Sequence, residues 1–224
     1  MLLRHGRTAH NAGGVIQGQT DVPLDDVGRT QAQQAAEVLA AAAPDVVVTS
    51  DLARARDTAQ AVADRTGAVL RVDPRLRELF LGAWQGLTSE QARERFPDEH
   101  AAWRRGQDVA RGGGETYADA GRRALACLEE LLPEVPAGGT LLAVTHGGTA
   151  RAAVAALLGL DRDTAWRLAP LGNTCWSVLV EAERGWRLER HNAGLGPLVG
   201  PATGGHDLGD DVRPAPGVAR ATDL

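Results

Sequence analysis

Two histidines share one local setting, in which an apolar strand-like segment ends and a glycine follows. His5 lies in Arg-His-Gly at residues 4–6, and His146 lies in Thr-His-Gly-Gly at 145–148. Glycine lets the backbone turn sharply and lets a ligand approach the main chain closely, so His-Gly at a strand end is typical of a binding site in an α/β sheet. One such histidine is as readily a satisfied polar residue of a turn. Two of them with arginines nearby favour a site.

Two arginines belong to the same regions of the sequence. Arg4 precedes His5 directly, and Arg54 falls in the first turn of a helix expected after the β-branched segment at 46–49. Guanidinium groups bind phosphate oxygens through paired hydrogen bonds, and helix N-termini add backbone donors. Alone, Arg54 is typical of a solvated helix arginine. Its expected place at the sheet edge shared with both histidines predicts an anion pocket.

The composition restricts the partners of such a pocket. The 224 residues carry a formal net charge of -5, with 43% hydrophobic and 24% charged residues. These values predict a folded soluble protein that binds neither nucleic acid nor a membrane surface, because both need a basic face. The two cysteines, Cys127 and Cys175, have no metal-ligand or disulfide-framework spacing. Without a signal-like or membrane-spanning stretch, we expect a cytoplasmic protein.

The elements that must position these residues alternate between strands and helices. This order predicts a three-layer α/β/α sandwich with a mostly parallel central sheet and its functional loops at the strand C-terminal ends. We expect a domain over 1–193 and a Gly/Pro/Asp-rich, poorly packed tail over 194–224. The expected strands are 2–3, 45–50, 68–72 and 140–145 with a closing hairpin at 176–180 and 186–190, and the expected helices are 26–43, 52–66, 88–96, 116–132 and 148–158, with a long loop over 8–26.

Five sequence blocks in order resemble the histidine phosphatase superfamily, in its phosphoglycerate mutase-like branch. One Arg-His-Gly alone is weak, but five blocks in the right order over residues 1–193 are specific. The blocks are Leu-Arg-His-Gly-x-Thr at 3–8, Gln-Gly-x-x-Asp-x-Pro-Leu at 17–24, Ser-Asp-Leu-x-Arg-Ala at 50–55, Leu-Arg-Glu with Gly-x-Trp-x-Gly at 76–86, and Val-Thr-His-Gly-Gly at 144–148.

This resemblance implies a role for each matching residue. Neutral His5 attacks phosphorus and becomes a phosphohistidine, while Arg4, Arg54 and His146 hold the phosphoryl oxygens. Glu78 protonates the leaving oxygen and then activates water, although its spacing alone is typical of a surface glutamate paired with Arg75 or Arg77. The residues that the resemblance implies for phosphate or substrate binding are Arg4, Asn11, Gln17, Gly18, Arg54, His146 and Gly147.

The expected activity is therefore metal-independent, cofactor-free hydrolysis of a phosphomonoester. The expected substrate is a small phosphorylated metabolite of the phosphoglycerate or sugar-phosphate type. A phosphoglycerate mutase is the alternative, disfavoured because residues 82–87 lead straight into a short helix where mutases carry a longer closing segment. A metal-dependent hydrolase or a non-catalytic anion-binding module is less favoured, because arginines beside both histidines repel a divalent cation.

Some features depart from the family pattern or stay open. Arg7 stands where relatives carry Glu or Gln, and we expect it to add positive charge at the pocket mouth. Trp84 is the tryptophan expected to line the pocket. The opening strand is short for the family, which leaves a start upstream of Met1 open, and a homodimer also stays open. We expect the remaining histidines to be ordinary surface or loop residues: His10, His100, His191 and His206.

Overall fold

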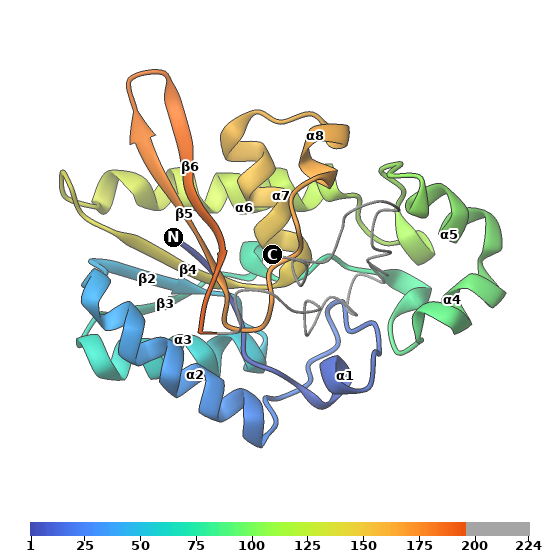
Figure 1. The fold of residues 1–224 in the computed structure, drawn as a ribbon, viewed down its shortest axis with the longest axis horizontal. Helices are drawn as coiled ribbons and strands as arrows, with labels where there is room; N and C mark the ends of the chain where they lie inside the picture. Colours follow the sequence, from blue (N-terminus) through green and yellow to red (C-terminus); the bar gives the residue numbers. More distant parts are fainter. Residues whose placement is uncertain (196–224) are drawn as a thin grey trace, which may run out of the picture.

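The computed structural model describes residues 1–195, which are organised around a six-stranded sheet (Figure 1). The strand order is β3-β2-β4-β1-β5-β6. Strands β1 to β4 are parallel and the β5-β6 hairpin is antiparallel at one edge, as expected for a mostly parallel sheet closed by a hairpin. The predicted tail lies, from residue 196 on, outside the described residues. The strands are β1 (Leu2–Arg4), β2 (Val46–Thr49), β3 (Leu70–Val72), β4 (Leu141–Thr145), β5 (Trp176–Ala182) and β6 (Gly185–Ala193).

Helices cover both faces of the sheet, which confirms the three-layer prediction. On one face lie α2 (Asp26–Leu39) and α3 (Ala53–Thr66), and on the other α6 (Tyr117–Leu131) and α7 (Gly147–Leu158) (Figure 1). Successive strand residues point to opposite faces, so Val47 packs in the core with α2 and α3. Val46 and Val48 pack in the core with α6 and α7. The uninterrupted apolar run of β2 follows from burial on both sides.

The α2 helix starts as predicted and ends four residues early. Its N-cap is Asp25, whose Oδ1 accepts a hydrogen bond from the Gly28 amide at 2.7 Å. The predicted helix reaches Ala43, but the α-helix stops at Leu39 and a tighter 3₁₀ turn follows. Proline disfavours helical geometry in the residue before it, and Ala43 before Pro44 is left-handed with φ 39°.

A small helical lobe lies beside the sheet, over residues 88–113 (Figure 1). Thr88 and Gln91 form the predicted capping box of α4 (Ser89–Arg95). The helix α4 ends before Phe96 and Pro97 as predicted, and Pro97 then occupies the first turn of α5 (Pro97–Arg104), where its missing N–H costs nothing. Three helices went unpredicted: α5, and the helices α1 (Ala9–Ala12) and α8 (Arg162–Trp166), whose four and five residues are too few to show a period. The 3₁₀ turns are η1 (Ala40–Ala42), η2 (Pro74–Leu76), η3 (Gly82–Trp84), η4 (Arg111–Gly113) and η5 (Leu132–Glu134).

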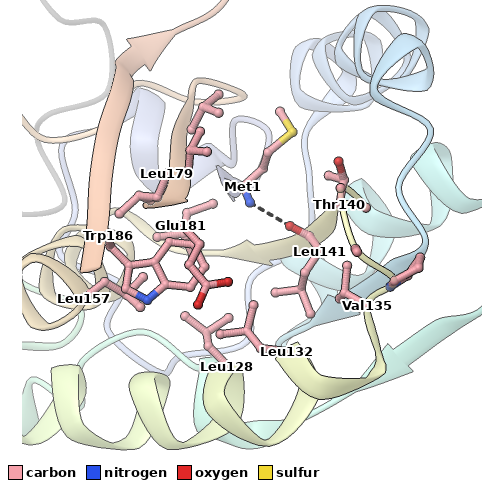
Figure 2. A pocket seen from close by; sticks show the side chains of 17 residues that line it. Met1, Leu128, Leu132, Val135, Thr140, Leu141, Leu157, Leu179, Glu181 and Trp186 are labelled. Carbon is pink, nitrogen blue, oxygen red and sulfur yellow. Dashed lines mark hydrogen bonds between the residues drawn. The ribbon is translucent and has the colours of Figure 1, made fainter. Parts of the chain in front are cut away.

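A cavity of about 610 Å³ opens at the N-terminal ends of the strands (Figure 2). Apolar side chains from α6 and the β5-β6 hairpin line it, among them Leu128, Leu179 and Trp186, and the Met1 amino group beside them donates to the Leu141 carbonyl at 2.6 Å. Both histidines of the predicted site follow the opposite ends of β1 and β4, so this cavity is remote from them. None of the helices within residues 1–195 combines the length and apolar character that a membrane crossing requires.

Candidate active site

His5 is fully buried directly after β1, and its ring orientation is fixed on both sides. Nδ1 lies 2.7 Å from the Gly6 carbonyl oxygen, which can only accept, so Nδ1 carries the proton. Nε2 therefore presents a lone pair, and the Arg54 Nε–H donates to it at 3.3 Å. Burial holds the pKa of His5 well below its ordinary value of 6.5; the Arg54 and Arg4 charges lower that pKa further, and the Gly6 hydrogen bond opposes them.

Arg54 is a fully buried side chain of α3, so the alternative of a solvated helix arginine is wrong. Its two terminal nitrogens donate to main-chain carbonyls of the 17–20 loop, Nη1 to Thr20 and Nη2 to Gly18, both at 2.8 Å. Gly18 has φ +53°, a conformation that side chains with a Cβ rarely adopt. The loop therefore directs the guanidinium toward His5.

His146 follows β4 as the N-cap residue of α7, and its ring centroid lies 5.0 Å from that of His5. Both of its ring nitrogens are buried and have no hydrogen-bond partner among residues 1–195. Burial lowers its pKa well below 6.5, with smaller contributions from Arg54, His5, Arg123 and Arg4. A neutral ring with unsatisfied nitrogens beside His5 suits contact with a phosphoryl oxygen.

Arg4 reaches the same cluster from the end of β1. It is 1% exposed, and its Nη1 donates to the Leu171 carbonyl at 2.6 Å. The main chain of Gly147 packs against this guanidinium, since a Cβ placed on Gly147 would lie 3.5 Å from the Arg4 Cζ. Two arginines thus flank two neutral imidazoles, and the cluster carries net positive charge at the C-terminal edge of the sheet, where anions are expected.

Glu78 approaches from the segment after η2 and is 3% exposed. Its Oε2 accepts from the Gly148 amide at 3.0 Å, and its Oε1 accepts from the Thr149 and Leu79 amides, both at 2.9 Å. The carboxylate therefore lies on the N-terminus of α7, the helix that His146 caps, where the helix dipole favours negative charge. Its surface pairing with Arg75 or Arg77 is not observed, since those arginines pair with Asp73 and Asp51.

Asn11 and Gln17 are buried beside this cluster and are joined through one threonine. Thr8 donates from its backbone N–H to Asn11 Oδ1 at 3.1 Å and from its hydroxyl to Gln17 Oε1 at 2.9 Å. Asn173 adds a contact that the sequence did not indicate, since its Nδ2 lies 3.0 Å from the His5 carbonyl and 3.2 Å from Asn11 Oδ1. A single asparagine in a loop 168 residues from His5 gives no local signal.

Other expectations about the pocket are corrected by the structure. Trp84 does not line the site: it is 1% exposed and stacks on Phe96 and His100 in the core of the lobe. His100 is accordingly a packing residue rather than a surface one. The positive charge of Arg7 is largely compensated, because its Nε pairs with Asp25 at 2.9 Å. The ring of His191 hydrogen-bonds to the Ser177 hydroxyl through Nδ1 and to the Ala169 carbonyl through Nε2. His206 lies outside the described residues.

The fold and this cluster define a phosphoryl-transfer enzyme of one family. The model of the histidine phosphatase superfamily (branch 1) matches residues 1–194, and the chain belongs to this superfamily. It is a metal-independent phosphomonoester hydrolase that works through a phosphohistidine.

Particular relatives narrow the comparison. A glucosyl-3-phosphoglycerate phosphatase of Mycobacterium tuberculosis is 42% identical over 209 residues, which cover 86% of this chain and 93% of the relative. A solved structure of the mycobacterial glucosyl-3-phosphoglycerate phosphatase with VO3 superposes with a TM-score of 0.82 at 43% identity and covers 86% of this chain and 98% of that one. A probable phosphoglycerate mutase of Yersinia enterocolitica is 38% identical over 190 residues, 83% of this chain and 86% of the relative.

Proposed function

We propose that this protein dephosphorylates glucosyl-3-phosphoglycerate or a closely similar sugar phosphoglycerate, with His5 as the residue that accepts the phosphoryl group. The observation that carries the proposal is the convergence of His5, His146, Arg4 and Arg54 with the carboxylate of Glu78 at one buried position. Similarity to the mycobacterial phosphatases supports the substrate. We place the reaction in the cytoplasm, which the two separate, unbridged thiols favour.

In the first step the Nε2 lone pair of His5 attacks phosphorus and the bond from phosphorus to the sugar-phosphoglycerate oxygen breaks. Arg4, Arg54 and His146 hold the phosphoryl oxygens, whose charge must be stabilised during transfer. Protonated Glu78 gives its proton to the leaving oxygen, which departs as an alcohol. The enzyme is left with a phosphohistidine and a Glu78 carboxylate.

In the second step water takes the place of the alcohol. The Glu78 carboxylate removes a proton from water, the water oxygen bonds to phosphorus, and the phosphorus–nitrogen bond breaks to release phosphate and neutral His5. The amides at the start of α7 stabilise the carboxylate form that this step needs. Asn11, Gln17, Gly18 and Gly147 belong to the walls of the phosphate pocket.

A substrate panel in EDTA tests the proposal. Phosphate release is measured from glucosyl-3-phosphoglycerate, 3-phosphoglycerate, α-ribazole phosphate and p-nitrophenyl phosphate and ranked by kcat/KM. We expect the glucosylated compound to rank first, His5→Ala to lose activity and phosphoenzyme labelling, and the matched control His191→Asn to keep both. Unchanged activity of His5→Ala contradicts the mechanism. Formation of 2-phosphoglycerate faster than phosphate would instead favour the mutase suggested by the Yersinia relative.

A homodimer is a separate part of the proposal, motivated by the frequency of dimers in the family. Light scattering of the purified protein at micromolar concentration tests it, and a mass of 23.5 kDa rather than twice that value contradicts it.

A further inference from the structure

We propose that Arg123 on α6 and Thr149 on α7 are positioning residues that clamp the Glu78 peptide and hold its carboxylate in line with the leaving oxygen. The inference rests on the proposed role of Glu78 and adds two residues, from two helices, to the machinery that acts on it. Their contacts converge on a segment that belongs to no strand or helix.

The segment that carries Glu78 has no regular hydrogen-bond ladder of its own. It lies between η2, which ends at Leu76, and η3, which starts at Gly82. Its backbone carbonyls therefore need partners from elsewhere, because buried main-chain groups without partners are costly. The position of the acid depends on what supplies those partners.

Arg123 on α6 supplies partners for two carbonyls of this segment and for one carbonyl of η2. Its Nη1 donates to the carbonyls of Arg75 and Arg77, both at 2.7 Å, and its Nη2 donates to the carbonyl of Glu78 at 3.0 Å. A planar guanidinium can grip several carbonyls at once in fixed geometry, which a lysine ammonium cannot.

Glu115 fixes the guanidinium from behind. It accepts from Arg123 Nε at 2.8 Å and from Nη2 at 2.9 Å through its two oxygens. The same carboxylate accepts from the Phe80 amide at 2.8 Å, and the Glu115 amide donates to the Phe80 carbonyl at 2.7 Å. Glu78 is thereby held at its own carbonyl and, two residues later, at Phe80.

Thr149, on the neighbouring helix α7, provides the other half of the clamp. Its buried hydroxyl donates to the Arg77 carbonyl at 2.7 Å and lies 3.2 Å from Oε1 of Glu78, which the Thr149 amide also contacts. The Arg77 carbonyl thus accepts from Arg123 and from Thr149, so both residues fix one peptide group. Misplacement of a catalytic group by about 1 Å can cost about 10²-fold in rate, so this anchoring bears directly on catalysis.

The dependence of kcat/KM on the leaving group distinguishes two roles for Arg123 and Thr149: positioning of the Glu78 acid, and general support of the fold. A proton donor matters for an alkyl phosphate, whose alcohol leaves poorly, and matters little for p-nitrophenyl phosphate, whose phenolate leaves unaided. We compare kcat/KM for p-nitrophenyl phosphate with kcat/KM for the most active alkyl phosphomonoester of the panel above. Thr149→Val keeps the shape and removes the hydroxyl, and Thr149→Ser restores it.

We expect Thr149→Val and Arg123→Gln to lower kcat/KM for the alkyl substrate at least ~10-fold more than for p-nitrophenyl phosphate, the signature of impaired acid catalysis. In Thr149→Ser, kcat/KM for the alkyl substrate should return toward the value of the parent protein. Arg123→Lys keeps the positive charge near His146 but loses the planar guanidinium that binds three carbonyls. It should therefore show the same loss of kcat/KM for the alkyl substrate as Arg123→Gln. In the double variant Thr149→Val/Arg123→Gln, the fold-loss of kcat/KM should be smaller than the product of the two single losses, because both residues donate to the Arg77 carbonyl.

Arg71→Gln is the matched control, since Arg71 pairs with Glu134 on the exposed surface. Equal losses on both substrates, or no loss, in folded Thr149→Val protein overturn the clamp, and Thr149→Val decides the question even if Arg123→Gln does not fold. Glu78→Gln is measured in parallel: if it shows no leaving-group dependence, the acid role itself fails, which is a separate outcome.

Discussion

At the residue scale, the protonation state of two buried rings sets the chemistry of the site. His5 must keep its Nε2 lone pair to attack phosphorus, and burial beside Arg54 and Arg4 disfavours the charged ring. The same burial lowers the pKa of His146. Neutral rings at physiological pH are thus a consequence of where the fold places them.

This burial predicts how stability depends on pH. Both rings have a folded-state pKa well below 6.5, so below pH 6.5 the unfolded chain binds protons that the folded protein does not, and the free energy of unfolding falls as pH falls. Between pH 7 and pH 5.5 we expect a loss of about 1 kcal/mol per histidine. Urea unfolding in a phosphate-free buffer at both values measures it.

The matched variants are His5→Asn and His146→Asn. Each removes one of the two titrating rings, so each should lose less stability over the same interval than the parent protein. Equal losses in the parent and both variants would show that other groups bind the protons.

The geometry of Arg54 leads to a second prediction at this scale. Two of its nitrogens are held by Gly18 and Thr20 while the third points at His5. Lysine keeps the charge but cannot make these three directed contacts, so Arg54→Lys should lower kcat/KM by about 10²-fold, the effect of losing one preorganised donor. Arg56→Lys, on the exposed face of the same helix, should stay near the parent value.

At the element scale, the contact between α2 and residues 6–7, which follow His5, depends on two glycines. A Cβ on Gly28 would lie 1.9 Å from the Arg7 carbonyl oxygen, and one on Gly6 would lie 2.5 Å from the Gly28 carbonyl oxygen. The first turn of α2 therefore lies directly on the main chain that follows His5. No flexible side chain can move aside to make room.

Gly28→Ala should consequently destabilise the protein and impair the site. Alanine gains about 1 kcal/mol in helix propensity over glycine, but overpacking against rigid backbone costs about 1–3 kcal/mol. We expect lower unfolding free energy and lower kcat/KM, measured by urea unfolding and phosphate release. Gly13→Ala is the control: its Cβ would lie 3.4 Å from the nearest atom, so stability should change by less than about 0.5 kcal/mol. If Gly28→Ala left both the unfolding free energy and kcat/KM unchanged, the close contact between Gly28 and Arg7 would be contradicted.

At the scale of the whole molecule, the topology brings four distant segments to one edge of the sheet. His5 follows β1, Arg54 lies in α3, Glu78 follows η2 and His146 precedes α7. Among residues 1–195 no group of three histidine, cysteine or acidic side chains is arranged to hold a metal ion. We propose that Arg4 and Arg54, both buried beside His5, stabilise the charge of the phosphoryl group at this edge.

Activity should therefore be insensitive to chelation. After dialysis against EDTA the protein should keep its full kcat/KM, and addition of Mg²⁺ or Zn²⁺ should not raise it, because Arg4 and Arg54 already supply the positive charge. Phosphate release together with elemental analysis of the same sample measures this. Loss of activity that one of these ions restores would contradict the prediction.

Elements with local signals could be predicted from the amino-acid sequence. The β-branched run 46–49 gives β2, the Thr88–Gln91 box gives the start of α4, and Asp25 gives the N-cap of α2. These features involve residues within a few positions of each other, so the order of strands and helices, and the strand ends that carry both histidines, could be predicted.

Contacts between side chains far apart in the sequence could not be predicted in this way. Glu78 contacts Thr149 across 71 residues, Asn173 contacts His5 across 168, and Trp84 is withdrawn into the lobe core instead of the pocket. Such contacts depend on how helices pack against the sheet, which no local pattern encodes. Roles for His5 and Glu78 could be proposed from the resemblance of the sequence to a family. The groups that hold Glu78 in place can be identified only from the way α6 and α7 pack around it.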